Sequence, residues 1–435
     1  RCAPCTSLTQ KARGDHHRMA SPAYSFHDAA LRSPLLRALN WAGARLAAVG
    51  LEAPSLTSEA IVRAAQKSAG SRDLGGDSFR EPLERYLEAA REEADLNLFG
   101  RLAVKGMLVQ ALRNRIDLAR WAREHQEVRE ETIQSPWVIV GLPRTGTSLL
   151  SILLGLDPNG RTLLQWEAAR LIPPPTLAPA AEDTRIAKNA KQLRQLLKLN
   201  PAIGAMHPFG ATIAQECVAL FMFDIRTLGV ETQAYVPSYG RWLQGCDMAP
   251  AYAQHKLALQ ALQAAQPTQR WVLKTPNHLW CLETLLETYP DARIIWTHRD
   301  PGKVITSLAS LVNAPQRVFT NRRDHAATAD EWLGKSRFAI ESGMAYDDRT
   351  NGDWCQHLRF ADLMKDPIGA VRGIYARYGE TPSALHVRRM EIWMKERGRH
   401  SEGLHVYDPK DFGWTYDGLA EGFSAYRERY DIPRE

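Results

Sequence analysis

Residues 137–150, WVIVGLPRTGTSLL, have the residue types and the spacing to bind a phosphate-like anion. The apolar run 137–140 is typical of a buried strand, residues 141–146 form a glycine-bounded loop, and Thr147 suits the start of a helix. Backbone N–H groups at a helix N-terminus have no partner within the helix, and the helix dipole favours negative charge there. The sequence therefore predicts a strand, a loop and a helix that together hold an anion.

The loop differs from the triphosphate-binding consensus G-x-x-x-x-G-K-[ST] at the position that carries the charge. Gly141 and Gly146 have the consensus spacing, but Thr147 stands where the lysine would be. Arg144 lies inside the loop instead, where its guanidinium can bind an oxyanion through two hydrogen bonds and stays charged at any pH. We therefore expect the loop to bind an anion other than a magnesium-bound nucleoside triphosphate.

Arg299 and Ser307 form a second pair of a cation and a hydroxyl, farther along the chain. Residues 292–300, ARIIWTHRD, have the pattern of another buried strand, and a helical pattern begins at Pro301. Arg299 thus stands at the end of a strand, and Ser307 lies one to two turns into the next helix. Such a pair suits a phosphate monoester, because a fixed cation and a hydroxyl donor can both bind the dianion.

Three segments in this order resemble the sulfotransferases that use 3′-phosphoadenosine-5′-phosphosulfate (PAPS), in their bacterial-type branch. Residues 143–148 are similar to the 5′-phosphosulfate loop of that family, and residues 299–307 to its 3′-phosphate motif. Residues 272–279, VLKTPNHL, are similar to its strand-end Lys-Thr-His segment. The resemblance runs from about residue 137 to the C-terminus. It implies transfer of a sulfuryl group from PAPS to a hydroxyl or amine of a small-molecule acceptor by in-line displacement, with no metal required.

The resemblance also implies roles for individual residues. The cofactor-binding candidates are Arg144, Thr145, Gly146, Thr147, Ser148, Arg299 and Ser307. The catalytic candidates are Lys274, His278, His207, Glu216 and Arg144. Lys274 would be the cation at the bridging oxygen, where negative charge grows as the S–O bond breaks.

Three of these side chains compete for the role of the base that takes the acceptor's proton. His278 has the position of the family's base after Lys-Thr, although two extra residues displace it. His207 and Glu216 form a titratable pair in the region where related enzymes place acceptor-binding and base residues. Each also has a structural alternative: His207 as a turn residue, Glu216 in a salt bridge, and His278 as a helix-capping or core histidine.

The C-terminal segment departs from one branch of the family. It lacks the Arg-Lys-Gly triplet with which the steroid- and phenol-type enzymes hold the 3′-phosphate of the cofactor. Its His-x-Tyr and Asp-Phe-Gly sequences are more similar to the bacterial-type branch. The residues that could replace the triplet are Arg397, Arg399, Gly403 and His405.

Two other classes of function fit parts of the sequence. A nucleotide-dependent kinase or NTPase would need a lysine after Gly146 and an acidic strand end for magnesium, but the second strand ends in His298 and Arg299, followed by Asp300. A non-catalytic nucleotide-binding module would keep the fold without the chemistry. Candidate catalytic groups at all three expected places argue against that alternative.

The fold class expected from these patterns is α/β: a P-loop-like three-layer fold, with a central parallel sheet flanked by helices and a helical N-terminal extension. We expect a disordered leader at residues 1–18, a helical N-terminal region at 19–130 that packs on the core, and the sulfotransferase α/β domain at 131–435. Helical spacing of the apolar residues between Leu35 and Val49 favours an ordinary buried face over a membrane-surface helix.

Composition limits the partners and the location. The 435 residues carry a net charge of +6, which suits an anionic ligand, but no Lys/Arg block is long enough to predict a nucleic-acid arm. No apolar run reaches the length of a membrane span and no signal-peptide pattern opens the chain, so we expect a cytoplasmic protein. Six cysteines in a chain of this length do not indicate a disulfide framework, and the C-x-x-C at Cys2 and Cys5 is interpreted as part of the leader. The Trp-containing N-terminal helices favour a hydrophobic acceptor.

Overall fold

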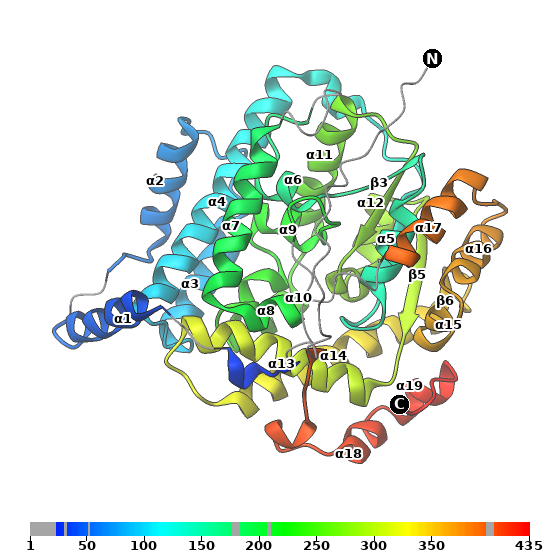
Figure 1. Cartoon of the computed structure of the whole chain (residues 1–435). Coiled ribbons are helices and arrows are strands. Elements are labelled where there is room, and N and C mark those ends of the chain that lie inside the picture. The colour runs from blue at the N-terminus through cyan, green and yellow to red at the C-terminus, as the bar shows by residue number, and fades with distance from the viewer. Residues whose placement is uncertain (1–22, 30–32, 51–52, 176–182, 207–209, 397–403) are drawn as a thin grey trace, which may run out of the picture.

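A parallel sheet with helices on both faces forms the centre of the computed structural model, which describes residues 23–29, 33–50, 53–175, 183–206, 210–396 and 404–435 (Figure 1). All five strands run in the same direction, in the order β3-β4-β2-β5-β6. Their bounds are Trp137–Val140 for β2, Gly160–Thr162 for β3, Arg270–Lys274 for β4, Arg293–His298 for β5 and Cys355–Arg359 for β6. The predicted α/β fold is confirmed.

Strand β2 is the middle strand of the sheet, and both of its faces are buried. Trp137 and Ile139 pack in one apolar core together with α5 (Thr147–Gly155) and α16 (Pro367–Arg377). Val138 and Val140 pack in the core on the opposite side, because successive side chains of a strand point to opposite faces. A strand covered on both faces has to be apolar throughout, which explains why the run 137–140 was a clear signal in the sequence.

The carboxyl ends of β4, β2 and β5 meet at one edge of the sheet. In the paired register Ile139 of β2 stands beside Lys274 of β4, and Val140 stands beside Trp296 of β5. The loop after β2 therefore emerges between the end of β4 and the end of β5. In open α/β sheets, this is where ligands bind.

A helical N-terminal region packs against the core that contains Val138 and Val140. Its helices are α1 (Pro34–Ala47), α2 (Ser58–Ala69), α3 (Arg80–Glu92) and α4 (Leu98–Glu124). Helix α4 is anchored by a buried ion pair, 2.7 Å long, between Arg115 and Asp224 of the 3₁₀ turn η4 (Met222–Asp224). This helical extension confirms that part of the predicted fold, whereas the division of the chain near residue 130 stays a prediction. The predicted leader at residues 1–18 lies outside the described residues.

Helix α1 contradicts one expectation about this region. None of its 14 residues is buried, and Leu35, with 77% of its surface exposed, and Trp41, with 64%, face outward. The prediction of an ordinary buried apolar face was therefore wrong. The helical spacing was right, but spacing alone does not say whether another element covers the face.

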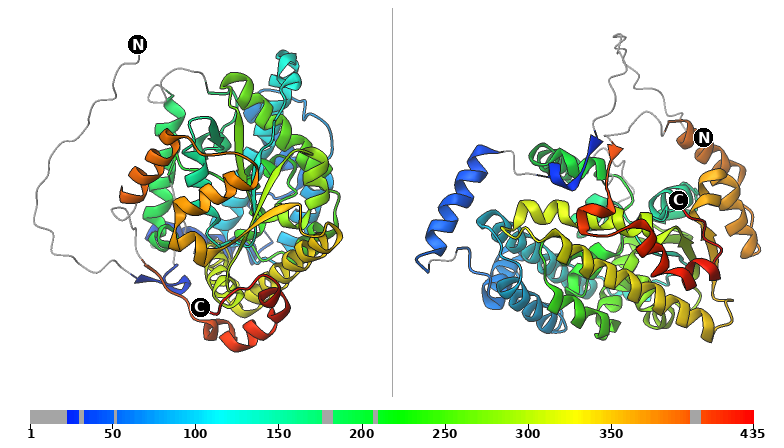
Figure 2. Two further views of the ribbon diagram at one scale, coloured as in Figure 1. Left: turned by 90° about the vertical axis from the view of Figure 1, so that its right-hand side faces the viewer. Right: turned by 90° about the horizontal axis from the view of Figure 1, so that it is seen from below.

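A two-stranded sheet joins distant parts of the chain. Strand β1 (Ala23–Tyr24) pairs in parallel with β7 (Leu404–His405), with Ala23 opposite Leu404 (Figure 2). Both strands lie against α8 (Pro201–Met206), and the turn η1 (Phe26–Asp28) packs on α13 (Pro301–Phe319). Segments before β2 and after β6 thus cover the region beside the loop that follows β2.

The remaining helices complete the layers around the sheet, and none of the described helices combines the length and apolarity that crossing a bilayer requires. Their bounds are Gln165–Ala169 for α6, Thr184–Leu199 for α7, Val218–Phe221 for α9, Pro237–Gly245 for α10, Ala249–Ala265 for α11, Leu282–Thr288 for α12, His325–Arg349 for α14, Phe360–Lys365 for α15, Ala384–Glu396 for α17, Tyr416–Glu421 for α18 and Ser424–Arg429 for α19.

Candidate active site

The loop between β2 and α5 presents a helix N-terminus to the edge of the sheet. Gly146 is the N-cap of α5 with a φ of 90°, and no side chain caps the helix there. A Cβ at this position would come within 2.9 Å of Leu363 and 3.1 Å of Phe360, so only glycine fits. The N–H groups of Thr147 and Ser148 are not taken by a capping side chain, which leaves the first turn of α5 suited to an anion.

Arg144 connects the loop to the second motif. Its Nε donates to the Oγ of Ser307 at 3.1 Å, and its Nη1 donates to the carbonyl oxygen of Met206 at 2.9 Å. Arg144 has a φ of 70°, a backbone conformation that residues other than glycine rarely adopt. The surrounding contacts therefore hold this conformation. Burial lowers the pKa of Arg144 from its ordinary value, and the nearby Arg299 acts in the same direction. An arginine nevertheless stays protonated near neutral pH.

Arg299 reaches the same place from the end of β5. Its Nη1 donates to the carbonyl oxygen of Arg144 at 3.0 Å, and its guanidinium lies 4.0 Å from the ring centre of Phe360. The carboxylate of Glu435 binds another edge of the same guanidinium. Its two oxygens accept hydrogen bonds from Nε at 2.9 and 3.0 Å. The two cations that sequence placed in separate motifs are therefore neighbours in one site.

Thr145 has a different position from the other loop residues. It is buried, donates to the carbonyl oxygen of Leu142 at 2.7 Å and pairs with the hydroxyl of Thr297 at 2.7 Å. Its side chain therefore braces the loop against β5. The predicted contact of Thr145 with a cofactor would have to come from its backbone N–H.

Lys274 and Glu216 meet beside the first turn of α5. The Nζ of Lys274 donates to a carboxylate oxygen of Glu216 at 2.5 Å and to the Oγ of Ser148 at 3.4 Å. The backbone N–H of Cys217 donates to the carbonyl oxygen of Lys274 at 2.8 Å, which fixes the segment that carries Glu216 to the end of β4. A buried lysine, a carboxylate and a hydroxyl thus lie together at the anion-binding end of α5.

His278 lies apart from this group. It is fully buried in the 3₁₀ helix η6 (Pro276–Trp280), and its Nδ1 is 2.7 Å from the hydroxyl of Tyr252. Burial, and then the neighbouring His255, hold the pKa of His278 well below its usual value. This placement does not fit the predicted role of a base, because the two extra residues after Thr275 form the first part of η6, which turns the imidazole into the core. His207 lies outside the described residues.

His278 belongs to a buried cluster with His255 and Cys217. One ligand atom of each lies within 4.8 Å of the other two, so the group has potential metal donors. The hydroxyl of Tyr289 lies 2.8 Å from the Nδ1 of His255. The expectation that the reaction needs no metal stays a prediction, which elemental analysis of the purified protein would check.

Two residues of the site were missed by sequence reasoning. Phe360 follows directly after β6 and contacts the Arg299 guanidinium. Its position, an aromatic residue at the carboxyl end of a strand, is the sequence signal that could have identified it. Glu435 pairs with Arg299, which lies 136 residues earlier in the chain. No local sequence pattern predicts such a contact.

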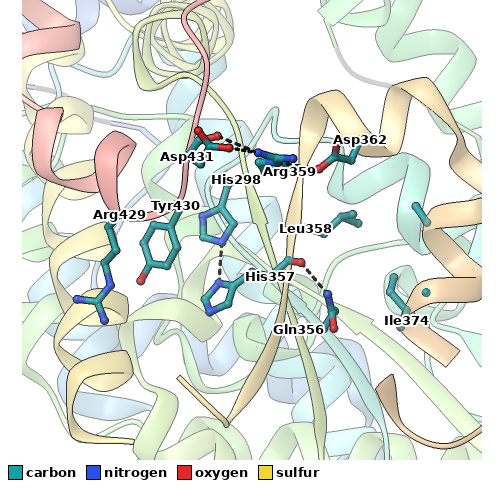
Figure 3. A pocket seen from close by; sticks show the side chains of 12 residues that line it. His298, Gln356, His357, Leu358, Arg359, Asp362, Ile374, Arg429, Tyr430 and Asp431 are labelled. Atoms are coloured by element: carbon teal, nitrogen blue, oxygen red, sulfur yellow. Dashed lines mark hydrogen bonds and ion pairs between the residues drawn. The ribbon is translucent and has the colours of Figure 1, made fainter. Parts of the chain in front are cut away.

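A surface cavity of about 520 Å³ adjoins the site along the edge strand β6 (Figure 3). In it, His298 and His357 face each other with their ring nitrogens 2.9 Å apart, and Arg359 pairs with Asp362 at 2.7 Å and with Asp431. Its lining includes none of the predicted site residues, although His298 directly precedes Arg299. The cavity is therefore a neighbour of the site and not the site itself.

Comparison with known proteins decides the family. Residues 136–382, more than half of the chain, match the model of the sulfotransferase family. The chain belongs to that family. The sulfotransferase resemblance drawn from the loop, the Lys-Thr segment and the Arg–Ser pair is thereby confirmed.

Two solved structures and a curated relative are similar to this sulfotransferase. Sulfotransferase STF9 from Mycobacterium avium is 27% identical with a TM-score of 0.80, over 88% of this chain and 99% of that one. Sulfotransferase STF1 from Mycobacterium tuberculosis H37Rv is 28% identical with a TM-score of 0.77, over 85% and 98%. The curated omega-hydroxy-beta-dihydromenaquinone-9 sulfotransferase Stf3 of Mycobacterium bovis is 26% identical over 129 residues, 29% of this chain and 32% of that protein. The matched segment spans about a third of that curated relative.

The buried histidines make the stability of this sulfotransferase depend on pH. Burial lowers the pKa of His255 to about 3, and those of His278 and His298 also lie well below 6.5. These imidazoles are neutral in the folded protein and take up protons on unfolding, so the unfolding free energy should fall as the pH drops below about 6.5, by about 1.4 kcal/mol per pH unit for each group. His255→Gln should remove one such contribution, measured by urea unfolding between about pH 6 and pH 4.

The exposed Ala253, two residues before His255 on α11, supplies the control for this prediction. Ala253→Ser introduces no titratable group and should leave the slope of unfolding free energy against pH unchanged. A slope for His255→Gln that equals the wild-type slope would show that burial of His255 does not govern the acid sensitivity.

Proposed function

We propose that this protein transfers a sulfuryl group from PAPS to a hydroxyl or amine of a small-molecule acceptor. The observation that carries the proposal is the hydrogen bond from Arg299 to the carbonyl of Arg144, across 155 residues, together with the bond from Arg144 to Ser307. Two cations and a hydroxyl from separate motifs thus surround one site. Such a site suits a ligand with two anionic groups joined through one adenosine.

The charges of the site support a doubly anionic ligand. The first turn of α5 and Arg144 would hold the 5′-phosphosulfate, whereas Arg299 and Ser307 would hold the 3′-phosphate. In the structure both oxygens of the Glu435 carboxylate accept hydrogen bonds from Arg299, and this supports the proposal that the guanidinium binds an oxyanion. The ring of Phe360 packs against the Arg299 guanidinium at 4.0 Å, which helps to fix the cation that would hold the 3′-phosphate.

The chemical step needs positioning and charge compensation. A new bond forms between the acceptor oxygen or nitrogen and sulfur, while the bond from sulfur to the bridging phosphate oxygen breaks and adenosine 3′,5′-bisphosphate leaves. Lys274, which contacts Ser148 at the start of α5, supplies a cation for the growing charge on the leaving group. Its burial makes this charge more effective than it would be in water.

Glu216 is the base that the described residues favour. It is bonded to Lys274 at 2.5 Å and keeps 23% of its side chain exposed, so an acceptor can reach it. The proton of the acceptor would pass to its carboxylate as the new bond forms. His207 remains the competing base, and the test below compares the two.

The acceptor is proposed to be apolar apart from the group that is sulfated. Stf3, the curated relative, is named for a hydroxylated dihydromenaquinone, and the N-terminal helices of this chain expose apolar side chains. No nucleic-acid partner is proposed. A cytoplasmic location, where PAPS would be available, stays a prediction.

A kinase or NTPase is disfavoured by the role of Asp300. Both of its carboxylate oxygens accept backbone N–H groups, from Gly302 at 3.0 Å and from Glu435 at 2.9 Å. The carboxylate therefore caps α13 instead of facing a metal ion. Thermal shift with adenosine 3′,5′-bisphosphate compared with ATP and magnesium separates the two functions: only the bisphosphate should stabilise the protein.

Loss of either cation should weaken binding of adenosine 3′,5′-bisphosphate. Arg144→Ala and Arg299→Ala each remove a charge-assisted contact worth about 1.5–3 kcal/mol, so titration calorimetry should show affinity reduced by roughly tenfold to a hundredfold. Arg388→Ala, at an exposed arginine on α17, is the matched control and should bind normally. Normal affinity in both site variants would overturn the proposed function.

Lys274 and the base should affect turnover more than binding. Lys274→Ala should lower kcat by roughly a hundredfold to a thousandfold with little change in affinity for the bisphosphate, because its charge matters most as the S–O bond breaks. Glu216→Gln should abolish the acidic limb of the pH–rate profile that deprotonation of the base creates. If His207→Ala removes that limb and Glu216→Gln keeps it, the histidine is the base.

Glu435 should compete with the ligand for Arg299. Glu435→Gln removes the charge of a partly exposed ion pair worth up to about 1 kcal/mol, so affinity for the bisphosphate should rise by roughly twofold to fivefold at low salt. Calorimetry at low and high ionic strength measures this, since salt should reduce the difference. An unchanged or lower affinity at low salt would show that the carboxylate does not occupy the ligand position.

A further inference from the structure

Helix α1 packs against the start of α4 along one face, and its other face is exposed to solvent. The side-chain oxygen of Asn40 accepts the backbone N–H of Phe99 at 2.8 Å, at the start of α4. A Cβ at Gly43 would lie 2.5 Å from the Cβ of Leu98, so glycine permits the close approach of the two helices. These contacts fix how α1 is rotated about its axis, and hence which side chains it turns to solvent.

The bare side carries large apolar side chains. Leu35, Trp41 and Leu46 are 77%, 64% and 45% exposed, and Val49, in the turn after the helix, is 72% exposed. A cluster of exposed apolar side chains within 15 residues is unusual for a surface that water alone contacts. It indicates a partner that removes this surface from water.

The charge of the segment indicates the chemistry of that partner. Residues 31–51 contain three arginines and no aspartate or glutamate. Arg37 and Arg45 are exposed on the helix, and the guanidinium of Arg45 lies 5.4 Å from the ring centre of Trp41. An exposed helix with tryptophan and leucine beside arginines, and without acidic residues, is typical of segments that lie in the interface of an anionic membrane.

The position of α1 agrees with a flat partner surface. The helix projects from the body of the molecule at the lower left of Figure 1, and the view from below in Figure 2 shows it standing out in the same way. Helix α1 begins at Pro34, six positions after the last residue of η1. Only Ser25 separates η1 from β1. Further exposed apolar side chains are Leu404, 60% exposed, in β7, the partner of β1, and Val406, 39% exposed, directly after β7.

We propose that α1 docks this protein on the surface of a bilayer that contains anionic lipids. Trp41, Leu46 and Val49 enter the interface between headgroups and acyl chains, while Arg37 and Arg45 lie among the anionic headgroups. This inference does not depend on the proposed reaction.

The test is co-sedimentation of the full chain with vesicles of known composition. Wild-type protein should bind vesicles of phosphatidylcholine with phosphatidylglycerol, bind pure phosphatidylcholine much less, and lose binding as salt increases. The double variant Trp41→Ser, Leu46→Ser should bind roughly tenfold less. Ile392→Ser is the matched control, because Ile392 is 48% exposed on α17, at another side of the molecule, and its loss should change nothing.

A second variant separates charge from apolar contact and guards against misfolding. Arg37→Gln, Arg45→Gln should weaken binding to the anionic vesicles and leave the weak binding to phosphatidylcholine as it was, and all variants should keep the wild-type melting temperature. Failure of wild-type protein to bind anionic vesicles would overturn the proposal, as would unchanged binding of both double variants. It would also be overturned if light scattering showed a dimer that Trp41→Ser, Leu46→Ser dissociates, since a second copy would then cover α1.

Discussion

The hydrogen bond from the guanidinium of Arg299 to the carbonyl of Arg144 joins the two halves of the site. It requires the loop after β2 to bring that carbonyl to the end of β5, and the loop can do so because Arg144 adopts a positive φ and Gly146 leaves room for Phe360. The bracing of Thr145 against Thr297 holds the loop in this shape. The anion site therefore depends on the spacing of β2 and β5, which the buried sheet sets.

The same contact brings two positive charges together in a partly buried place, and this has an electrostatic cost. Carbonyl oxygens, a serine hydroxyl and the carboxylate of Glu435 offset the cost in the structure as described. An anionic ligand would offset it better, because it would approach both cations and the first turn of α5 at once. Preorganised charge of this kind is how many enzymes gain both affinity and catalysis.

Most of the α/β core was predictable from the sequence, because strands buried on both faces are short and apolar throughout, and residues 137–140 and 293–298 have that pattern. The convergence of Arg144 with Arg299 was predictable from the order of the motifs. The burial of His278 in the core was not predictable, since it depends on how two extra residues fold into η6. The exposure of α1 and the pairing of Glu435 with Arg299 were also beyond the sequence, because each depends on elements far away in the chain.

The pairing of β1 with β7 has a consequence for the order in which the protein is made. Strand β7 and Glu435 come from the last part of the chain, and His405 of β7 bonds to Ser310 at 2.9 Å close to Arg144. The sheet can assemble once residue 359 has left the ribosome, but the contacts beside Arg144 and Arg299 also need residues 404–435. Until those residues have been synthesised, the two arginines would lack the cover that this segment supplies.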